Sequence, residues 1–142
     1  METLERSAAS EAWALIAQLF TSQRTRFLAI ASEFDLAPAQ LGALKALDPE
    51  DPLPMRELAQ ALACDNSNVT GIVDRLEARG LVERRASTDD RRVKMLVVTE
   101  AGKDLRRRVK ARMEEPPEAL KRLTPEEQVL LRDLLRKAMS RA

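Results

Sequence analysis

Small polar and basic side chains gather between residues 66 and 94 of this 142-residue chain. In the first half of this stretch, Asn68 can pair bidentately with adenine, and the methyl group of Thr70 can meet the methyl group of thymine. Arginines in the second half can contact phosphates or enter the minor groove, where the negative potential is enhanced. That half has three acids against six cations, which are Arg79, Arg84, Arg85, Arg91, Arg92 and Lys94. These residue types point to nucleic-acid recognition.

Two short helices are expected to position the small polar residues. Residues 55–62 predict the first helix, residues 63–65 a short connection and residues 66–79 the second helix, which ends at Gly80. Apolar residues of the second helix fall at i, i+3, i+4 and i+7 and form one stripe. The stripe consists of Val69, Ile72, Val73 and Leu76. The opposite face is small or polar, which allows close approach to another surface; it carries Ser67, Thr70, Gly71, Asp74 and Ala78.

A β-hairpin is predicted to follow these helices. Residues 81–85 and 93–98 are rich in β-branched and long apolar side chains, which favour strands. The polar residues 86–92 between them form a loop with arginines at its tip, and Leu53 is expected to add a minimal third strand at the base. Two short helices followed by a hairpin make a winged helix-turn-helix, whose second helix fits a major groove.

The run from Asn66 to Val82 resembles the recognition helix of the MarR family of bacterial transcription regulators. Asp90-Arg91-Arg92, followed by Val97-Val98-Thr99-Glu100-Ala101-Gly102, resembles the wing of that family and the start of its next helix. The resemblance extends over nearly the whole chain. It implies one mainly α domain over residues 1–142 with a small β-hairpin wing. In that domain, a winged helix-turn-helix region at 38–99 lies between dimerisation helices at 7–34 and 103–140.

The resemblance also implies which residues contact DNA. In the recognition helix they are Asn66, Ser67, Asn68, Thr70, Gly71 and Arg75, and in the wing they are Arg84, Arg85, Asp90, Arg91 and Arg92. Ser67, Asn68 and Thr70 are expected to face bases, whereas Arg75 contacts a phosphate or orients the helix. Arg92 reaches into the minor groove, and Asp90 holds the wing tip by pairing with an arginine or capping the turn.

The other arginines of the wing would contact phosphates. Some of these residues have a simpler alternative. Ser67 and Asn68 could cap the helix, in competition with Asp65. Arg84 and Arg85 could be solvated strand residues.

Composition excludes several other functions. The net charge is only +1, which argues against a general basic coat and places the emphasis on the local cluster of arginines. The sequence has no histidine and one cysteine, so imidazole chemistry, an internal disulfide and a structural zinc site are not expected. We predict no metal, no cofactor and no enzymatic activity. The N-terminus lacks the character of a signal peptide and no apolar run could span a bilayer, so we predict a cytoplasmic protein.

Long amphipathic helices are predicted on both sides of the winged region. Residues 7–34 form a helix with a broad apolar stripe, which could pack on its own domain or, together with Trp13, against a second subunit. Pro38 begins a short helix with Leu41, Leu44 and Leu47 on its core face. Gly42 within it suggests close helix packing. Residues 48–54, with three prolines, form a loop.

Two helices are predicted after the wing. Thr99 caps a strongly basic helix, whose apolar stripe is Ala101, Leu105, Val109 and Met113. Its basic face could be solvated or could contact phosphates, and Pro116-Pro117 ends it. Thr124-Pro125 with Glu127 starts a last helix with a capping box. The apolar face of this helix, formed by Val129, Leu130, Leu131, Leu134, Leu135, Ala138 and Met139, is wide enough to need an intramolecular partner and a symmetry mate.

The resemblance further implies a homodimer on a pseudo-palindromic DNA operator, with half-sites one helical turn, or about 10 bp, apart. The protein would be a repressor, released by a small aromatic or anionic ligand that binds between the dimer helices and the winged region. Phe20, Phe27, Leu44 and Arg24 or Arg26 are candidates for that ligand pocket. Cys64 near a helix N-terminus could be a redox sensor, although a packed small residue is the simpler interpretation.

A second class of function is a helical protein-interaction adaptor that reuses a winged-helix scaffold. The near-neutral net charge favours it, whereas the small polar helix face and the arginine wing favour DNA. Ionic strength separates the two, because DNA binding weakens steeply with salt and a hydrophobic protein contact does not.

Overall fold

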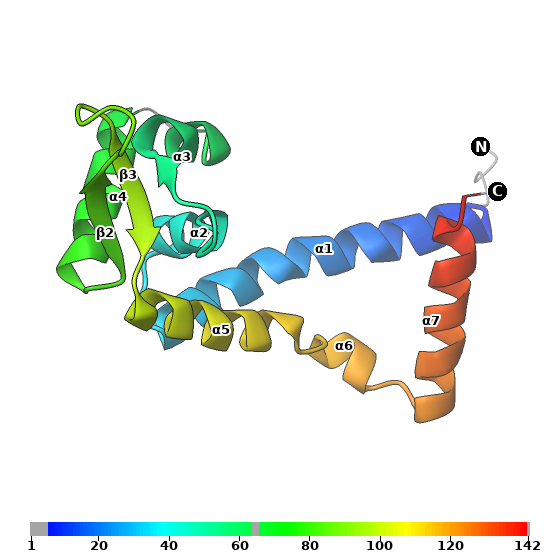
Figure 1. Cartoon of the computed structure of the whole chain (residues 1–142). Coiled ribbons are helices and arrows are strands. Elements are labelled where there is room, and N and C mark those ends of the chain that lie inside the picture. Colours follow the sequence, from blue (N-terminus) through cyan, green and yellow to red (C-terminus); the bar gives the residue numbers. More distant parts are fainter. Residues whose placement is uncertain (1–5, 64–65, 142) are drawn as a thin grey trace.

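The computed structural model describes residues 6–63 and 66–141. Its helices are α1 (Ala8–Glu33), α2 (Pro38–Ala46), α3 (Met55–Ala61), α4 (Asn66–Ala78), α5 (Glu100–Glu114), α6 (Glu118–Lys121) and α7 (Pro125–Met139). The strands are β1 (Leu53–Pro54), β2 (Val82–Ala86) and β3 (Lys94–Val98). The mainly α fold with a small β-hairpin is therefore confirmed. In Figure 1 the sheet and the short helices form one end of the molecule, from which α1 and α5 extend toward α7.

Short-range signals account for the ends of the helices. Ser7 caps α1 by accepting a hydrogen bond from the backbone N–H of Ser10, and Thr124 caps α7 with the predicted capping box. The C-terminus of α4 ends at Gly80, whose φ of 71° is the left-handed conformation expected there. Asp35 has the same role after α1, with a φ of 56°, and aspartate is one of the few residue types besides glycine that adopt this conformation.

The three strands form one antiparallel sheet in the order β1-β3-β2. Leu96 of β3 lies opposite Leu53 of β1 on one side and opposite Arg84 of β2 on the other. The minimal third strand predicted at Leu53 is confirmed. Because β3 is central, β2 is an edge strand, and it runs beside α4.

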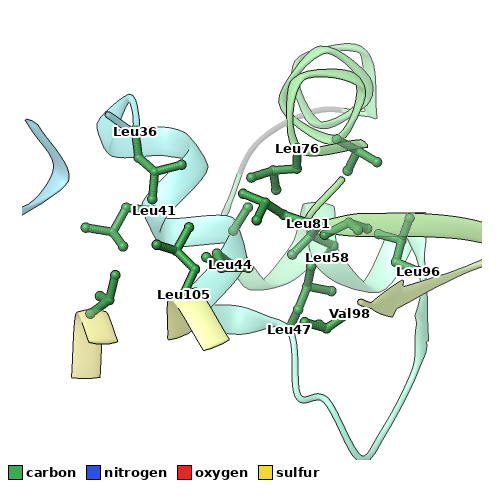
Figure 2. Packing of buried hydrophobic residues seen from close by; sticks show 14 of the residues in the cluster. Leu36, Leu41, Leu44, Leu47, Leu58, Leu76, Leu81, Leu96, Val98 and Leu105 are labelled. Carbon is green, nitrogen blue, oxygen red and sulfur yellow. The ribbon is translucent and has the colours of Figure 1, made fainter. Parts of the chain in front are cut away.

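One apolar core joins the sheet to the short helices and to the inner ends of α1 and α5. Figure 2 shows leucines from these elements converging on it, among them Leu44, Leu58, Leu76, Leu96 and Leu105. Val69 and Val73 of α4 are also fully buried, so the stripe predicted for this helix is confirmed. We call this part the winged unit: α2, β1, α3, α4, β2 and β3, with the ends of α1 and α5 that pack on them.

The glycine whose backbone lies closest to a neighbouring element is not the predicted one. A Cβ atom added to Gly42 would lie 3.9 Å from Leu62 Cδ2, which is ordinary contact, so the expectation of close packing there is wrong. A Cβ atom on Gly102 would lie 2.1 Å from the carbonyl oxygen of Leu81. The buried stripe of α5 accordingly begins at Gly102 rather than at the exposed Ala101, and it continues with Leu105 and Val109.

The outer helices, defined as residues 8–29 of α1 together with α6 and α7, have little cover within one chain. Pro116-Pro117 ends α5 as predicted, but the short helix α6 follows, which the sequence did not indicate. The apolar face of α7 has no extensive packing partner among the described elements, so the intramolecular neighbour predicted for it is absent. Its exposed side chains include Val129, Leu130, Leu134, Leu135 and Met139. No helix in the described ranges is long and apolar enough to cross a membrane.

Candidate nucleic-acid interface

Helix α4 presents a small polar face to solvent. Its buried side holds it on the core, so Asn68, Thr70 and Gly71 remain exposed on the outside. A Cβ atom added to Gly71 would meet nothing within 4 Å. Arg75 is exposed on the flank of this face, and its side chain makes no hydrogen bond or ion pair with the residues that the structure describes. A groove of about the width of a helix could therefore receive this face without rearrangement of the core.

Three predicted residues lie at the limit of what the structure describes. Asn66 and Ser67 form the first turn of α4, as predicted, but their side chains are not among those described. Cys64 lies outside the described residues, so the redox hypothesis for it stays a prediction.

The wing tip is held by Asp90, as predicted. Its Oδ1 accepts a hydrogen bond from the backbone N–H of Arg92 at 3.0 Å and from Arg92 Nε at 3.3 Å. Both interpretations of Asp90, turn capping and pairing with an arginine, are confirmed. The side chain of Arg92 is 92% exposed, and Arg91 beside it is exposed as well. The tip therefore presents two guanidinium groups to solvent.

The two arginines of β2 have different partners. Arg85 is exposed and pairs with Glu83 of the same strand, with Nη2 and Oε2 2.7 Å apart. Arg84 is only 22% exposed, and it pairs with Asp74 at 2.5 Å and with Glu77 at 3.0 Å, both on α4. Its predicted role as a phosphate contact or a solvated residue did not anticipate these partners. The backbone pattern marks Arg84 only as a strand residue, and its partners are seven and ten positions away.

Other arginines hold the elements of the winged unit together through contacts that the sequence did not predict. The guanidinium of Arg79, after α4, donates to the carbonyl oxygens of Asp35 and Phe34 at the end of α1. Arg106 of α5 donates to the carbonyl oxygens of Leu44 and Lys45 at the end of α2. The basic face of α5 thus has a structural role that neither predicted alternative included.

A polar joint fastens α1 to the end of α5. Arg112 makes two hydrogen bonds with the carboxylate of Glu33, at 2.8 and 2.7 Å, and a third with Glu115. Arg26 of α1 donates to the carbonyl oxygens of Arg112 and Glu115, where α5 ends. The hydrogen bond with Arg112 lowers the pKa of Glu33, and the pKa of Arg112 is raised by the same bond. We call Arg26, Glu33, Arg112 and Glu115 the joint.

A cavity of about 560 Å³ lies between the winged unit and α5. Apolar side chains such as Leu41, Leu44 and Val109 form its inner wall. Cations outnumber acids on its lining: Lys45, Lys103, Arg106, Arg107 and Lys110 against Glu50 and Glu114.

The four residues predicted for a ligand pocket do not come together in one chain. Leu44 lines the cavity, and the half-buried Phe27 lies beside it, with Lys45 Nζ 5.6 Å from the centre of its ring. Phe20 is 73% exposed on the outer part of α1, and Arg24 is exposed one turn further along. The prediction joined residues by their place on one helix, whereas the cavity is made mainly by α2 and α5. Among the described residues, no group of histidine, cysteine, aspartate and glutamate could hold a metal ion.

Comparison with known proteins identifies the family. A profile described as the MarR family matches residues 36–94, from the end of α1 to the first residue of β3. FarR of Neisseria gonorrhoeae, an HTH-type transcriptional regulator, is 30% identical over 78% of this chain and 77% of its own. MdtR of Bacillus subtilis, an HTH-type transcriptional repressor, is 34% identical over 59% of this chain and 54% of its own.

A solved structure of NadR in complex with 4-hydroxyphenylacetate is similar over 97% of both chains, with a TM-score of 0.64 and 29% identity. The chain spans less than two thirds of the length of several curated relatives that it matches, MdtR among them. The match with FarR covers most of both proteins, and the family profile covers α2, β1, α3, α4 and β2 of the winged unit described above. The chain belongs to the MarR family of winged helix-turn-helix proteins.

Proposed function

We propose that the protein is a dimeric, sequence-specific DNA-binding transcription regulator, which represses its targets until a small ligand releases it. The observation that carries this proposal is the pairing of two exposed elements on one winged unit. Helix α4 presents a small polar face, and the wing tip beside it presents Arg91 and Arg92. The first fits a major groove and the second an adjacent minor groove. The relatives named as transcriptional regulators and repressors support the same function.

The outer helices supply the dimer in this proposal. Trp13, Leu15 and Phe20 of α1 and the apolar face of α7 are exposed in one chain, and a second copy would cover them. The dimerisation region predicted at 7–34 and 103–140 is thus reduced to the outer helices in our proposal. The inner ends of α1 and α5 belong to the core of the winged unit instead. A twofold dimer places two winged units on one face of DNA, with half-sites about 10 bp apart in a pseudo-palindromic operator.

Within each half-site, Asn68 and Thr70 face bases, with Asn66, Ser67 and Gly71 beside them. Arg75 and Arg85 contact phosphates, which position the protein without reading sequence. Arg91 contacts the backbone near the tip, and Arg92 enters the minor groove with Asp90 holding its direction. The guanidinium of Arg84 has its partners, Asp74 and Glu77, within the protein.

The cavity between the winged unit and α5 is our proposed ligand site. Its apolar wall suits an aromatic ring, and the excess of cations on its lining suits a carboxylate. NadR, whose solved complex contains 4-hydroxyphenylacetate, supports a ligand of that kind. A ligand changes DNA binding only if it binds one arrangement of the two winged units more tightly than the other. Aromatic carboxylates, starting with 4-hydroxyphenylacetate, should therefore be titrated into the DNA complex of the parent and of Lys110→Glu.

The test of DNA binding is selection of bound fragments from genomic DNA by the purified protein, with Arg92→Ala in parallel. We expect a pseudo-palindrome, bound in a salt-sensitive way, and a loss of about 1–3 kcal/mol of binding free energy in the variant. Arg122, an exposed arginine directly after α6, provides the matched control, and Arg122→Ala should bind like the parent. If no sequence is enriched at low salt, the adaptor alternative becomes the better explanation.

A further inference from the structure

Two carboxylates lie on the recognition helix, beside the face proposed to meet DNA. Asp74 and Glu77 are three residues apart and are both largely exposed. Like charges at this spacing repel each other, and carboxylates near a phosphate backbone weaken its binding. One guanidinium, that of Arg84 in β2, pairs with both of them.

The same strand residue is bound a second time through its backbone. Arg84 lies on the edge strand β2, opposite Leu96 of β3, and its N–H points away from the sheet. Glu77 Oε2 accepts a hydrogen bond from that N–H at 3.2 Å, while Glu77 Oε1 accepts one from Arg84 Nη1 at 3.0 Å. An outward N–H on an edge strand has no strand partner of its own, so the helix supplies the acceptor. We call these contacts of Arg84 with Asp74 and Glu77 the tether.

The tether lies at a defined level of the wing. Leu96 is the central residue of a row that runs from Leu53 in β1 through β3 to Arg84 in β2. Below this row, Val82 and Val98 are buried in the core, whereas above it the wing narrows to the exposed tip with Arg92. Arg92 is about 13 Å from the row, since it precedes Leu96 by four residues at about 3.3 Å per strand residue. A small rotation of the wing about this row therefore displaces Arg92 several times farther than it displaces a residue near the base of the wing.

We propose that Arg84 is a positioning residue for DNA binding, which locks the wing to the recognition helix through Asp74 and Glu77. The proposal rests on the proposed function. Helix and tip then approach the major and minor grooves as one rigid body, with no loss of wing freedom on binding. Arg84 itself contributes no phosphate contact, because its guanidinium is occupied and largely covered.

Two explanations of Asp74 and Glu77 predict opposite changes in DNA affinity when their charges are removed. If Asp74 and Glu77 were only negative charges near DNA, removing either charge would strengthen binding. If they hold the wing, removing either weakens binding although the protein becomes more positive. Glu83 is the matched control, because it is an exposed acid on the same strand and pairs, among the residues that the structure describes, with Arg85 alone.

The experiment measures binding to the selected operator by Asp74→Asn, Glu77→Gln and Glu83→Gln, each alone and combined with Arg92→Ala. We expect the first two to weaken binding about two- to fivefold, the range for partly exposed ion pairs, and Glu83→Gln to bind equally well or more tightly. In the Arg92→Ala background the losses from Asp74→Asn and Glu77→Gln should become smaller, since one of the two tip contacts that the tether positions, that of Arg92, is gone. A general loss of stability would cost the same in both backgrounds.

Hydrogen exchange of the Arg84 amide in the free protein provides a readout without DNA. We expect exchange to be several-fold faster in Glu77→Gln and unchanged in Glu83→Gln. Tighter operator binding by Asp74→Asn and Glu77→Gln, or losses of the same size with and without Arg92, would overturn the proposal, as would unchanged exchange in Glu77→Gln. A parent protein that selects no DNA sequence overturns the proposed function and the DNA role of Arg84 with it. A failure of the proposed function alone can be distinguished from a failure of the tether, because the Arg84 amide would still exchange faster in Glu77→Gln than in the parent.

Discussion

The winged unit and the outer helices differ in how far their apolar side chains are buried within one chain. In the winged unit, leucines and valines of six elements bury one another, and arginines such as Arg79 and Arg106 bond the backbone carbonyls at the ends of helices. In the outer helices, comparable apolar side chains face solvent in a single chain, among them Trp13 at 69% exposure and Leu134 at 55%. The winged unit therefore has a complete core within one chain, whereas the outer helices keep an apolar face that only another molecule can cover.

This difference separates two kinds of amphipathic helix that look alike in sequence. Helix α4 and helix α7 each carry an apolar stripe at helical spacing. Only α4 has neighbours on the same chain that fill the volume in front of its stripe, namely α2, α3 and β2. The stability of the winged unit should therefore depend on its own side chains, and that of the outer helices on protein concentration.

The largest effect is expected from a charge on α7. In a single chain, Leu134→Asp would cost little, because the side chain is already half exposed. If a second copy covers it, the substitution leaves a desolvated carboxylate in the interface and prevents dimerisation. Operator binding should then fall about 100-fold or more, because the two half-sites are no longer linked.

Sedimentation and operator titration of the Leu134→Asp protein check this prediction. Lys137→Asp places the same charge on an exposed position of the same helix and should remain dimeric. If the Leu134→Asp protein sediments like the parent, a second copy does not cover the apolar face of α7, and the proposed dimer interface is wrong.

The next effect concerns the packing of the winged unit. Gly102→Ala would place a methyl group 2.1 Å from the carbonyl oxygen of Leu81, which is backbone and cannot turn away. We expect a loss of about 3 kcal/mol in the free energy of unfolding, measured by urea titration. Gly42→Ala, with its nearest contact at 3.9 Å, should be neutral or stabilising, although both substitutions add a methyl group to a helix. Equal losses in the two variants would contradict the contact at Gly102.

A smaller effect separates stability from DNA binding within α4. Gly71→Ala adds a methyl group that meets nothing within 4 Å, so it should raise the free energy of unfolding by about 0.5–1 kcal/mol. The same methyl group would stand on the face proposed to meet the major groove, and operator binding should weaken several-fold. Thermal unfolding and operator titration on one preparation give both values. A variant that gains stability and binds normally would place Gly71 away from DNA.

The smallest effect belongs to the joint between the two regions. Arg112 lowers the pKa of Glu33 below its ordinary value of about 4.5, so the pairing stabilises the fold above that pH. The stabilisation is lost as the pH falls through the lowered pKa. Glu33→Gln should therefore be slightly less stable than the parent at pH 7, and the difference should shrink toward pH 3. Urea titrations at both pH values measure it, and a difference that grows on acidification would contradict the assignment.

Much of the fold follows from the sequence because its signals are short in range. The cap at Thr124, the turn at Gly80 and the stripe of α4 each depend on residues within one or two helical turns, where backbone geometry fixes their relation. The same holds for the wing tip, since Asp90 and Arg92 are two residues apart and the carboxylate reaches its partner through a local turn. Residue types and spacing were sufficient for these predictions.

Only the tertiary structure decided the partners of side chains that reach between elements. Whether Arg84 meets phosphate, solvent or the carboxylates of α4 depends on how closely β2 folds back beside that helix. The same reason explains why Gly102 rather than Gly42 makes the close contact, and why the cavity forms between α2 and α5 rather than along α1. The periodicity of α7 predicts an apolar stripe that must be covered, but in one chain the stripe stays exposed, because no described element packs extensively on it.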